Sequence, residues 1–251
     1  DVTQFFKTYY APNNAVLTLV GDFKSSEATE KIKKYFEEIP EQPAPPPVDM
    51  AEPAQTKERK TTIEDSFARL PRLDVVYKTV PGNTPDWYAL DMLGDILFGG
   101  PSSRLYQKLV KEKAVALQVA GGIDMRRGTA LFQALAMMKP GQDAAEVEKL
   151  IYEEFERVKT DGVTTAELEK IRIQDRLQQA ESLTNTMSRA RTLGRYAVYF
   201  HDPNLINTTL ANYNEVTPAD IRRVARQYLG ETQRTVVLTT PKAEAQKAPA
   251  R

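Results

Sequence analysis

The segment LDMLGDILFGGPSSRLYQKLVKEKAVALQVAGG, residues 90–122, decides the predicted fold because it combines two helices and a strand in one short stretch. Apolar residues at three- and four-residue spacing follow the start signal Thr84-Pro85, and Gly99-Gly100 ends this first helix. A second, short helix is predicted over residues 102–113. Residues 115–124 are aliphatic and indicate a strand. The segment therefore predicts helices packed against a sheet.

Further strands are predicted on both sides of this segment. The run GTALFQALAMM, residues 128–138, follows the polar turn after residue 124, as expected of an antiparallel pair. Residues 61–80 indicate one or two strands, of which LDVVYKTV is the clearer, and TVVLTT at 235–240 is the last strand. We expect an α+β fold in which helices pack on a mostly antiparallel sheet.

The helices after residue 140 are marked by capping signals. Asp143 with Glu146, and Thr164 with Glu167, have the spacing of a capping box. The second pair starts a helical region that we expect to run to about Tyr199. A further helix follows Pro203, and the stretch Thr217-Pro218-Ala219-Asp220 starts the last one.

The N-terminal stretch 1–40 has a different character. It predicts the end of a helix, a turn at Pro12-Asn13-Asn14, a buried strand over Ala15–Val20, and a helix capped by Ser25 or Ser26 that Pro40 stops.

The chain order of elements in residues 1–20 is repeated at the C-terminal end. KTYYAPNNAVLTLVG and RQYLGETQRTVVLTTP share a helix end, a tyrosine, a polar turn and an aliphatic strand. We therefore expect residues 1–40 to be the tail end of a truncated unit whose body lies upstream. The proline-rich stretch 41–60 is predicted to be a linker, 61–243 a complete α+β domain, and 244–251 a disordered tail.

The amino-acid composition limits which kinds of partner are expected. Lys+Arg and Asp+Glu each number 34, so the basic excess typical of nucleic-acid binding is absent and no nucleic-acid partner is expected. No apolar run approaches the roughly 18 residues of a membrane span, and a soluble protein is expected. The chain has no cysteine, which excludes disulfides and thiolate ligands but leaves both the bacterial periplasm and the cytoplasm open.

Few residues of this chain are of the types that form a hydrolytic site. A hydrolytic zinc site needs about three protein ligands and one open position, and the chain offers a single histidine, His201. That histidine stands in a predicted helix-ending turn, where a capping or surface role is the simplest interpretation. No glycine-rich phosphate loop is present. We expect no catalytic residue and no metal ligand in this chain.

Four segments in order resemble the pitrilysin/insulinase-type zinc peptidases and the mitochondrial processing peptidase. They are YYAPNNAVLTLVGDF, the 90–122 segment, GVTTAELEK and VTPADIRRVARQYL, which together span nearly the whole chain. The resemblance implies a metallohydrolase-like unit of the processing peptidase type, two of which stand in one chain in this family.

The resemblance also implies what is missing. The family's first unit carries H-x-x-E-H and a later glutamate, the zinc site, and these residues contain no such motif. The second unit can add an arginine and a tyrosine that stabilise the oxyanion, but Val110 and Leu117 stand at those positions and cannot donate a hydrogen bond. By analogy, the chain is similar to the C-terminal, non-catalytic portion of a zinc-bearing subunit, with zinc in the upstream half.

The resemblance implies three partners: the upstream zinc-bearing half of the same protein, a partner subunit bearing the Arg/Tyr pair, and a peptide substrate. The candidate substrate-proximal residues are Phe98, Gly99, Gly100, Ser102, Ser103 and Arg104. A purely structural helix–helix corner is the alternative for this stretch, and Arg104 fits either an acidic group across the chamber or an interdomain ion pair. Two other functions stay open, a structural or assembly subunit and a peptide-binding module that uses a sheet edge.

Overall fold

The structure, a computed structural model, describes residues 1–242, so the tail predicted at 244–251 lies outside the described residues. Its helical elements are α1 (Val2–Tyr9), η1 (Pro12–Asn14), α2 (Ser25–Phe36), α3 (Pro85–Phe98), η2 (Tyr106–Glu112), α4 (Ala144–Asp161), α5 (Thr165–Thr184), α6 (Thr186–Phe200), α7 (Leu205–Glu215), α8 (Pro218–Tyr228) and η3 (Glu231–Gln233). Its strands are β1 (Arg59–Asp65), β2 (Arg72–Lys78), β3 (Ala116–Ile123), β4 (Leu131–Met138) and β5 (Arg234–Pro241).

The chain forms two compact units. The small unit contains Asp1–Met50 and Arg176–Thr209, and the sheet unit contains Ala51–Asp175 and Leu210–Arg251. Residues 176–209 group with the N-terminal stretch although they lie between β4 and β5 in sequence. The domain boundaries expected from the sequence stay a prediction.

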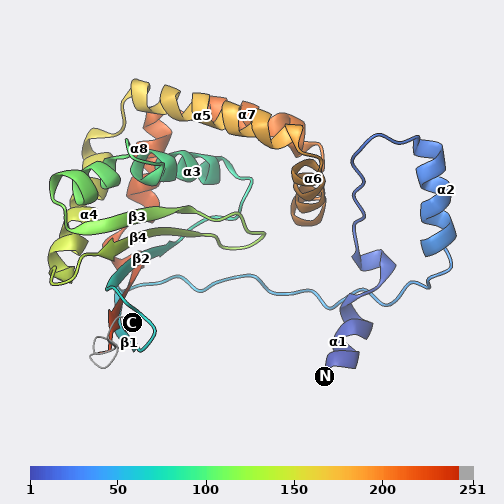
Figure 1. Ribbon diagram of the computed structural model, residues 1–251, viewed down its shortest axis with the longest axis horizontal. Coiled ribbons are helices and arrows are strands. Elements are labelled where there is room, and N and C mark those ends of the chain that lie inside the picture. Colours follow the sequence, from blue (N-terminus) through green and yellow to red (C-terminus); the bar gives the residue numbers. More distant parts are fainter. Residues whose placement is uncertain (243–251) are drawn as a thin grey trace, which may run out of the picture. The chain divides into compact units, whose positions relative to one another are not determined.

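The sheet unit holds a five-stranded sheet in the order β1-β5-β2-β4-β3 (Figure 1). Only the β1–β5 pair is parallel, and the other three neighbouring pairs are antiparallel. Each predicted strand of this region is present. The expected α+β fold, with helices on a mostly antiparallel sheet, is therefore confirmed.

One face of the sheet carries the core. Successive side chains of a strand point to opposite faces, and on β2 the alternate residues Leu73, Val75 and Tyr77 are each no more than 1% exposed. Helix α3 packs against β3, α4 packs against β4, and α8 packs against both helices. Residues of the other set, such as Val76 and Gln133, stay partly or fully exposed. The helices of this unit therefore cover one face of its sheet.

Local signals explain where these helices begin. The side chain of Thr84 accepts a hydrogen bond from Trp87 N, and Pro85 occupies the first helical position of α3. Thr217 and Asp220 form the complete capping box of α8. Asp143 caps α4 through Ala145 N, without the reciprocal bond that a capping box would add. The predicted starts are confirmed because caps depend on short-range sequence.

The extended stretch Ala15–Val20 of the small unit differs from expectation. It is neither a buried nor a paired strand: Val16, Leu17 and Leu19 are between 50% and 61% exposed. A strand is stabilised by hydrogen bonds to a neighbour, and no strand pairs with this stretch in the part of the chain that the structure describes. The prediction was wrong because an aliphatic pattern shows that a segment can form a strand, but not that a second strand is present to pair with it.

Two helix predictions also need correction. The helix at residues 25–36 begins behind Lys24, and no serine side chain caps it. The helical region expected to run to about Tyr199 consists of two helices, because Asn185 leaves helical geometry and accepts a hydrogen bond from Ser188 N to start α6. His201 ends α6 in the left-handed conformation, which confirms the predicted helix-ending turn.

Candidate functional site

The corner at residues 98–104 is built by two glycines. A Cβ on Gly99 would lie 2.4 Å from the Asp95 carbonyl oxygen, and Gly100 has a φ of +87°. Both positions therefore require glycine for close approach and for a left-handed backbone. The hydroxyl of Ser103, which is 2% exposed, donates to the Gly100 carbonyl at 2.7 Å and ties the corner together. The serine closes the turn and does not cap the next helix.

The corner exposes only part of the predicted site. Phe98 is 8% exposed and lies against Gly121 of β3, where a Cβ would approach its ring to 2.7 Å. Gly100 and Ser102 are exposed, and the Ser102 hydroxyl is in contact with the ammonium of Lys170. Gly100 and Ser102 are therefore the predicted substrate-proximal positions that solvent reaches most freely.

Arg104 joins three elements within the sheet unit. Its guanidinium donates to both carboxylate oxygens of Glu167 at 2.6 and 2.8 Å, to Glu154 at 3.2 Å and to the Gly162 carbonyl at 3.2 Å. Glu167 in turn completes the capping box with Thr164 at the start of α5. The hydrogen bonds from Arg104 lower the pKa of Glu167 to about 2. Such bidentate pairs fix orientation as well as charge, so Arg104 holds the corner on α4 and α5.

The segment after the corner has unusual geometry. Residues 106–112 form a π-helix, and Ala114 has a positive φ of 52°. π-helical turns are rare and occur frequently at functional sites. Val110 lies in this π-helix and packs against the core. Val110 is thus a partly buried aliphatic side chain.

Leu117 marks a bulge in an edge strand. The register of β3 against β4 shifts between Ala116 and Gln118, so Leu117 has no partner residue of its own. Its side chain is 51% exposed. Bulges re-aim side chains and are frequent beside binding sites. Since β3 lies at the end of the sheet, its outer edge carries no strand within residues 1–242.

A buried acidic cluster escaped the sequence analysis. The Asp91 carboxylate accepts a hydrogen bond from the Tyr213 hydroxyl at 2.6 Å. Burial, with the charges of Asp95 and Asp175 adding to it, raises the pKa of Asp91 to about 7. Burial and the Asp95 charge likewise raise the pKa of Asp175 to about 7. The available signal was the pair Asp91 and Asp95, four residues apart in a helix whose residues after Asp86 are otherwise apolar.

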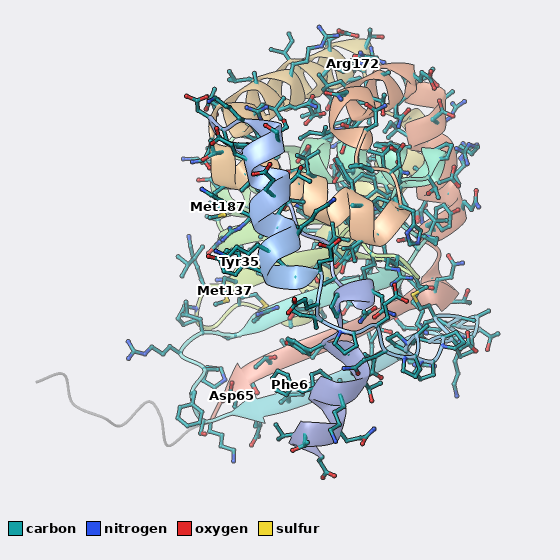
Figure 2. All side chains as sticks on the ribbon, turned by 90° about the vertical axis from the view of Figure 1, so that its right-hand side faces the viewer. Phe6, Tyr35, Asp65, Met137, Arg172 and Met187 are labelled. Carbon is teal, nitrogen blue, oxygen red and sulfur yellow. The ribbon has the colours of Figure 1, made fainter. Side chains whose placement is uncertain are left out.

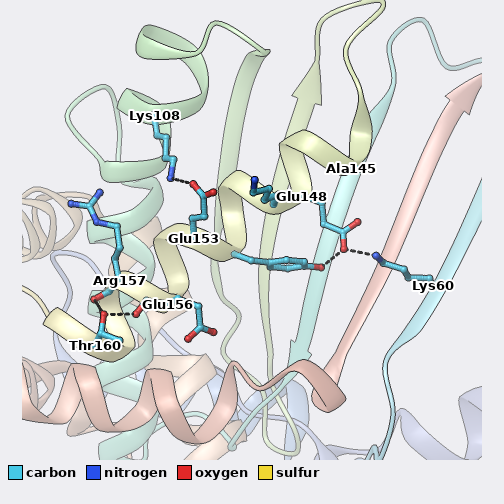
Figure 3. Close-up of a pocket in the computed structure, with 10 residues that line it drawn as sticks. Lys60, Lys108, Ala145, Glu148, Glu153, Glu156, Arg157 and Thr160 are labelled. Carbon is cyan, nitrogen blue, oxygen red and sulfur yellow. Dashed lines mark hydrogen bonds and ion pairs between the residues drawn. The ribbon is translucent and has the colours of Figure 1, made fainter.

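A groove of about 700 Å³ runs along the outer surface of α4 (Figure 3). Glu148, which is 9% exposed, forms an ion pair there with Lys60 at 2.5 Å and accepts a hydrogen bond from the Tyr152 hydroxyl at 2.7 Å. The Arg234 guanidinium lies 4.0 Å from the centre of the Tyr152 ring. The buried carboxylate of this groove is therefore already paired with Lys60 and Tyr152.

The residues present do not fit a zinc centre. Zinc in hydrolytic sites takes about three protein ligands around one point. In the described stretch 1–242, no three His, Cys, Asp or Glu side chains are placed to hold a metal ion. His201 is exposed at the end of α6. The same stretch contains no helix with the length and apolar character that a bilayer crossing needs.

Comparison with known sequences places this geometry in a family. The family described as Peptidase M16 inactive domain matches residues 1–174. The zinc protease PqqE of Helicobacter pylori is 30% identical over 245 residues, which cover 96% of this chain and 54% of that protein. An uncharacterized zinc protease of Streptomyces coelicolor is 24% identical over 234 residues, covering 91% of this chain and 50% of that protein. The chain spans about half the length of these relatives.

Solved structures agree with the sequence relatives. A protease from Helicobacter pylori superimposes with a TM-score of 0.90 at 29% identity, covering 96% of this chain and 58% of that one. A peptidase M16 inactive domain from Pseudomonas fluorescens shares the fold with a TM-score of 0.80 at 20% identity, covering 96% and 57%. These matches confirm the resemblance to zinc peptidases. The chain belongs to the Peptidase M16 inactive domain family.

Proposed function

We propose that this chain is the non-catalytic C-terminal half of a zinc-dependent peptidase, where it forms one wall of the peptide chamber and docks the substrate. The zinc site is then held by an upstream half of the longer protein. The observation that carries the proposal is the outer edge of β3, which pairs with no strand within residues 1–242 and carries the exposed bulge residue Leu117. Extended peptides add to such edges through backbone hydrogen bonds.

The sheet face that α3 and α4 leave uncovered supports the proposal that this unit forms a wall of the chamber. Along β2 and β4 the residues that point away from α3 and α4 are only partly buried by this unit. They combine aliphatic side chains, such as Val76 and Leu135, with the polar Gln133. A surface of this mixed kind is suited to contact many peptide sequences, because backbone pairing at the edge carries no sequence preference.

The exposed surface of the small unit supports the proposal that the upstream half of the longer protein docks there. This unit exposes many large apolar side chains, among them Phe6 at 51% and Tyr35 at 67%, both labelled in Figure 2. A second groove, of about 520 Å³, lies between α2 and the stretch that leads to it, and is lined by Leu19, Phe23 and Phe36. Exposed large apolar side chains in this number are typical of an interaction site. We propose that an upstream zinc-bearing half covers it.

The missing arginine and tyrosine point to a third component. Neither Val110 nor Leu117 can donate a hydrogen bond to an oxyanion. We therefore propose that a partner subunit bearing the Arg/Tyr pair completes the site. The same observation also favours the competing candidate, a structural or assembly subunit without peptidase activity.

Peptide hydrolysis by the full-length protein tests the proposal. Residues 1–251 alone are expected to bind no stoichiometric zinc and to cleave no peptide, whereas the full-length protein with its partner should do both. Leu117→Asp should lower kcat/KM about tenfold, as a lost apolar contact and an added charge would do. Ile63→Asp is the matched control, because Ile63 is 48% exposed on β1 at the opposite edge of the sheet.

Two outcomes would count against docking at β3. Equal losses in the two variants would show a general effect of edge charge rather than a specific site. A full-length protein without zinc or activity, even with its partner, would instead support the assembly subunit. Reading the upstream sequence for H-x-x-E-H separates the same two functions.

A further inference from the structure

Helix α6 concentrates positive charge on arginines that form no ion pair with the residues the structure describes. Its 15 residues include Arg189, Arg191 and Arg195 and no aspartate or glutamate. All three arginines are exposed, and none forms an ion pair with residues 1–242. By contrast, Arg104 and Arg234 of the sheet unit are each paired with carboxylates. The charge on α6 is therefore available to a partner.

Two of these arginines lie in a stripe with apolar residues. At 100° per residue, Met187, Arg191, Arg195 and Val198 fall within about 80° of one another around the helix. Met187, labelled in Figure 2, is 59% exposed and Val198 is 43% exposed. Along the axis the order is apolar, cationic, cationic, apolar. Exposed apolar groups at both ends of a cation pair distinguish this stripe from an ordinary solvated helix face.

The surface of α6 next to the stripe is occupied within its own unit: at 100° per residue, Ala190 and Gly194 lie about 60° and 20° from Met187, on the side away from Arg195. The Thr18 hydroxyl donates to the Ala190 carbonyl at 3.1 Å. The Thr18 methyl lies 3.5 Å from the position that a Cβ on Gly194 would take. Because this contact holds the helix against the extended stretch, the stripe is presented on a packed element.

The spacing of the stripe matches an extended peptide. Its residues are four, four and three positions apart, which at 1.5 Å per residue gives steps of about 6, 6 and 4.5 Å. In an extended strand, side chains on one side recur every two residues, about 6.6 Å. A seven-residue segment with apolar residues at its ends and carboxylates at its third and fifth positions therefore meets all four side chains. The small excess in length is within the reach of arginine and methionine side chains.

We propose that the α6 stripe binds an extended acidic peptide segment of the pattern apolar-x-acid-x-acid-x-apolar. Charge complementarity selects the acidic positions, and the two end residues contribute buried apolar area. The site lies in the small unit and is separate from the β3 edge. The proposal goes beyond the proposed function, because binding at α6 requires neither zinc nor hydrolysis.

Fluorescence anisotropy with labelled peptides tests this site in the full-length protein. The probe contains the core LTETETL, in which threonine favours an extended backbone. Arg191→Glu combined with Arg195→Glu should weaken binding by about tenfold, the effect of two exposed ion pairs. The neutral core LTQTQTL should bind the unmodified protein as weakly as LTETETL binds the double variant. The control variant reverses Arg69 and Arg222, which are exposed in the sheet unit, and should bind LTETETL normally.

A peptide whose charges are reversed provides the decisive experiment. The core LTKTKTL should bind the α6 double variant more tightly than it binds the unmodified protein. If LTETETL binds both proteins equally, or LTKTKTL fails to prefer the reversed helix, the proposal is wrong. Binding of phosphatidylglycerol vesicles, but of no peptide, would assign α6 to a membrane surface and would also overturn it. Hydrolysis of an unrelated peptide, measured in parallel, reports separately on the proposed function.

Discussion

Replacing Asp91 by asparagine should change how stability depends on pH. Asp91 lies on α3 and accepts a hydrogen bond from Tyr213, and its pKa is raised from 3.8 to about 7, mainly by burial. In unfolded chains the carboxyl ionises near pH 4. The folded state therefore binds more protons than the unfolded state between about pH 4 and 7, and stability falls as pH rises through this window.

The size of the effect follows from the pKa difference. A rise of about 3 pKa units at about 1.4 kcal/mol per unit gives a cost of about 4 kcal/mol once Asp91 is ionised in both states. Asparagine has nearly the same shape, accepts the Tyr213 hydrogen bond and never ionises. The Asp91→Asn variant should therefore gain stability relative to the unmodified protein, by under about 1 kcal/mol at pH 4 and by about 4 kcal/mol at pH 8.

Urea denaturation followed by tryptophan fluorescence measures this difference. Trp87 is the only tryptophan, is 3% exposed and lies on the same helix, so its emission reports on the packing of α3. Asp86→Asn is the matched control. Its partner Arg223 lowers the pKa of Asp86, so this variant should lose stability at neutral pH relative to acid. Parallel stability curves for the Asp91→Asn and unmodified proteins from pH 4 to 8 would refute the reasoning.

Three further substitutions test how the sheet unit is held together. Arg104→Ala leaves the carboxylate of Glu154, which is 2% exposed, with its bond from Arg157 only, and should cost about 2 kcal/mol in urea denaturation, while Arg104→Lys restores part of it. Gly121→Ala places a Cβ 2.4 Å from the Gln133 carbonyl oxygen and should destabilise by about 2 kcal/mol; a Tm equal to that of the unmodified protein would show that β3 shifts freely. Thr217→Ala removes the capping box of α8 and should cost about 1 kcal/mol, whereas Thr217→Ser should be nearly neutral in the same measurement.

The helix starts and the strand positions of the sheet unit followed from the sequence alone. Caps such as Thr84 and Thr217 act on backbone groups within three residues, so the chemistry that starts a helix is written in neighbouring positions. The alternation in β2 and β4 likewise reports a sheet with one buried face. The composition established in advance that one histidine and no cysteine cannot build the zinc site of a peptidase.

Other features depended on distant parts of the chain. Ala15–Val20 has the composition of a strand, yet pairing requires a second strand that local pattern does not supply. Arg104 could be placed in the sequence but not assigned its partners, because Glu154 and Glu167 stand 50 and 63 residues away and meet it only when α4 and α5 pack. The raised pKa of Asp91 arises in the same way, since burial and the charge of Asp175 come from tertiary contacts. Interactions within one helical turn were therefore determined by sequence, whereas burial, charge pairing and strand edges were decided by the folded structure.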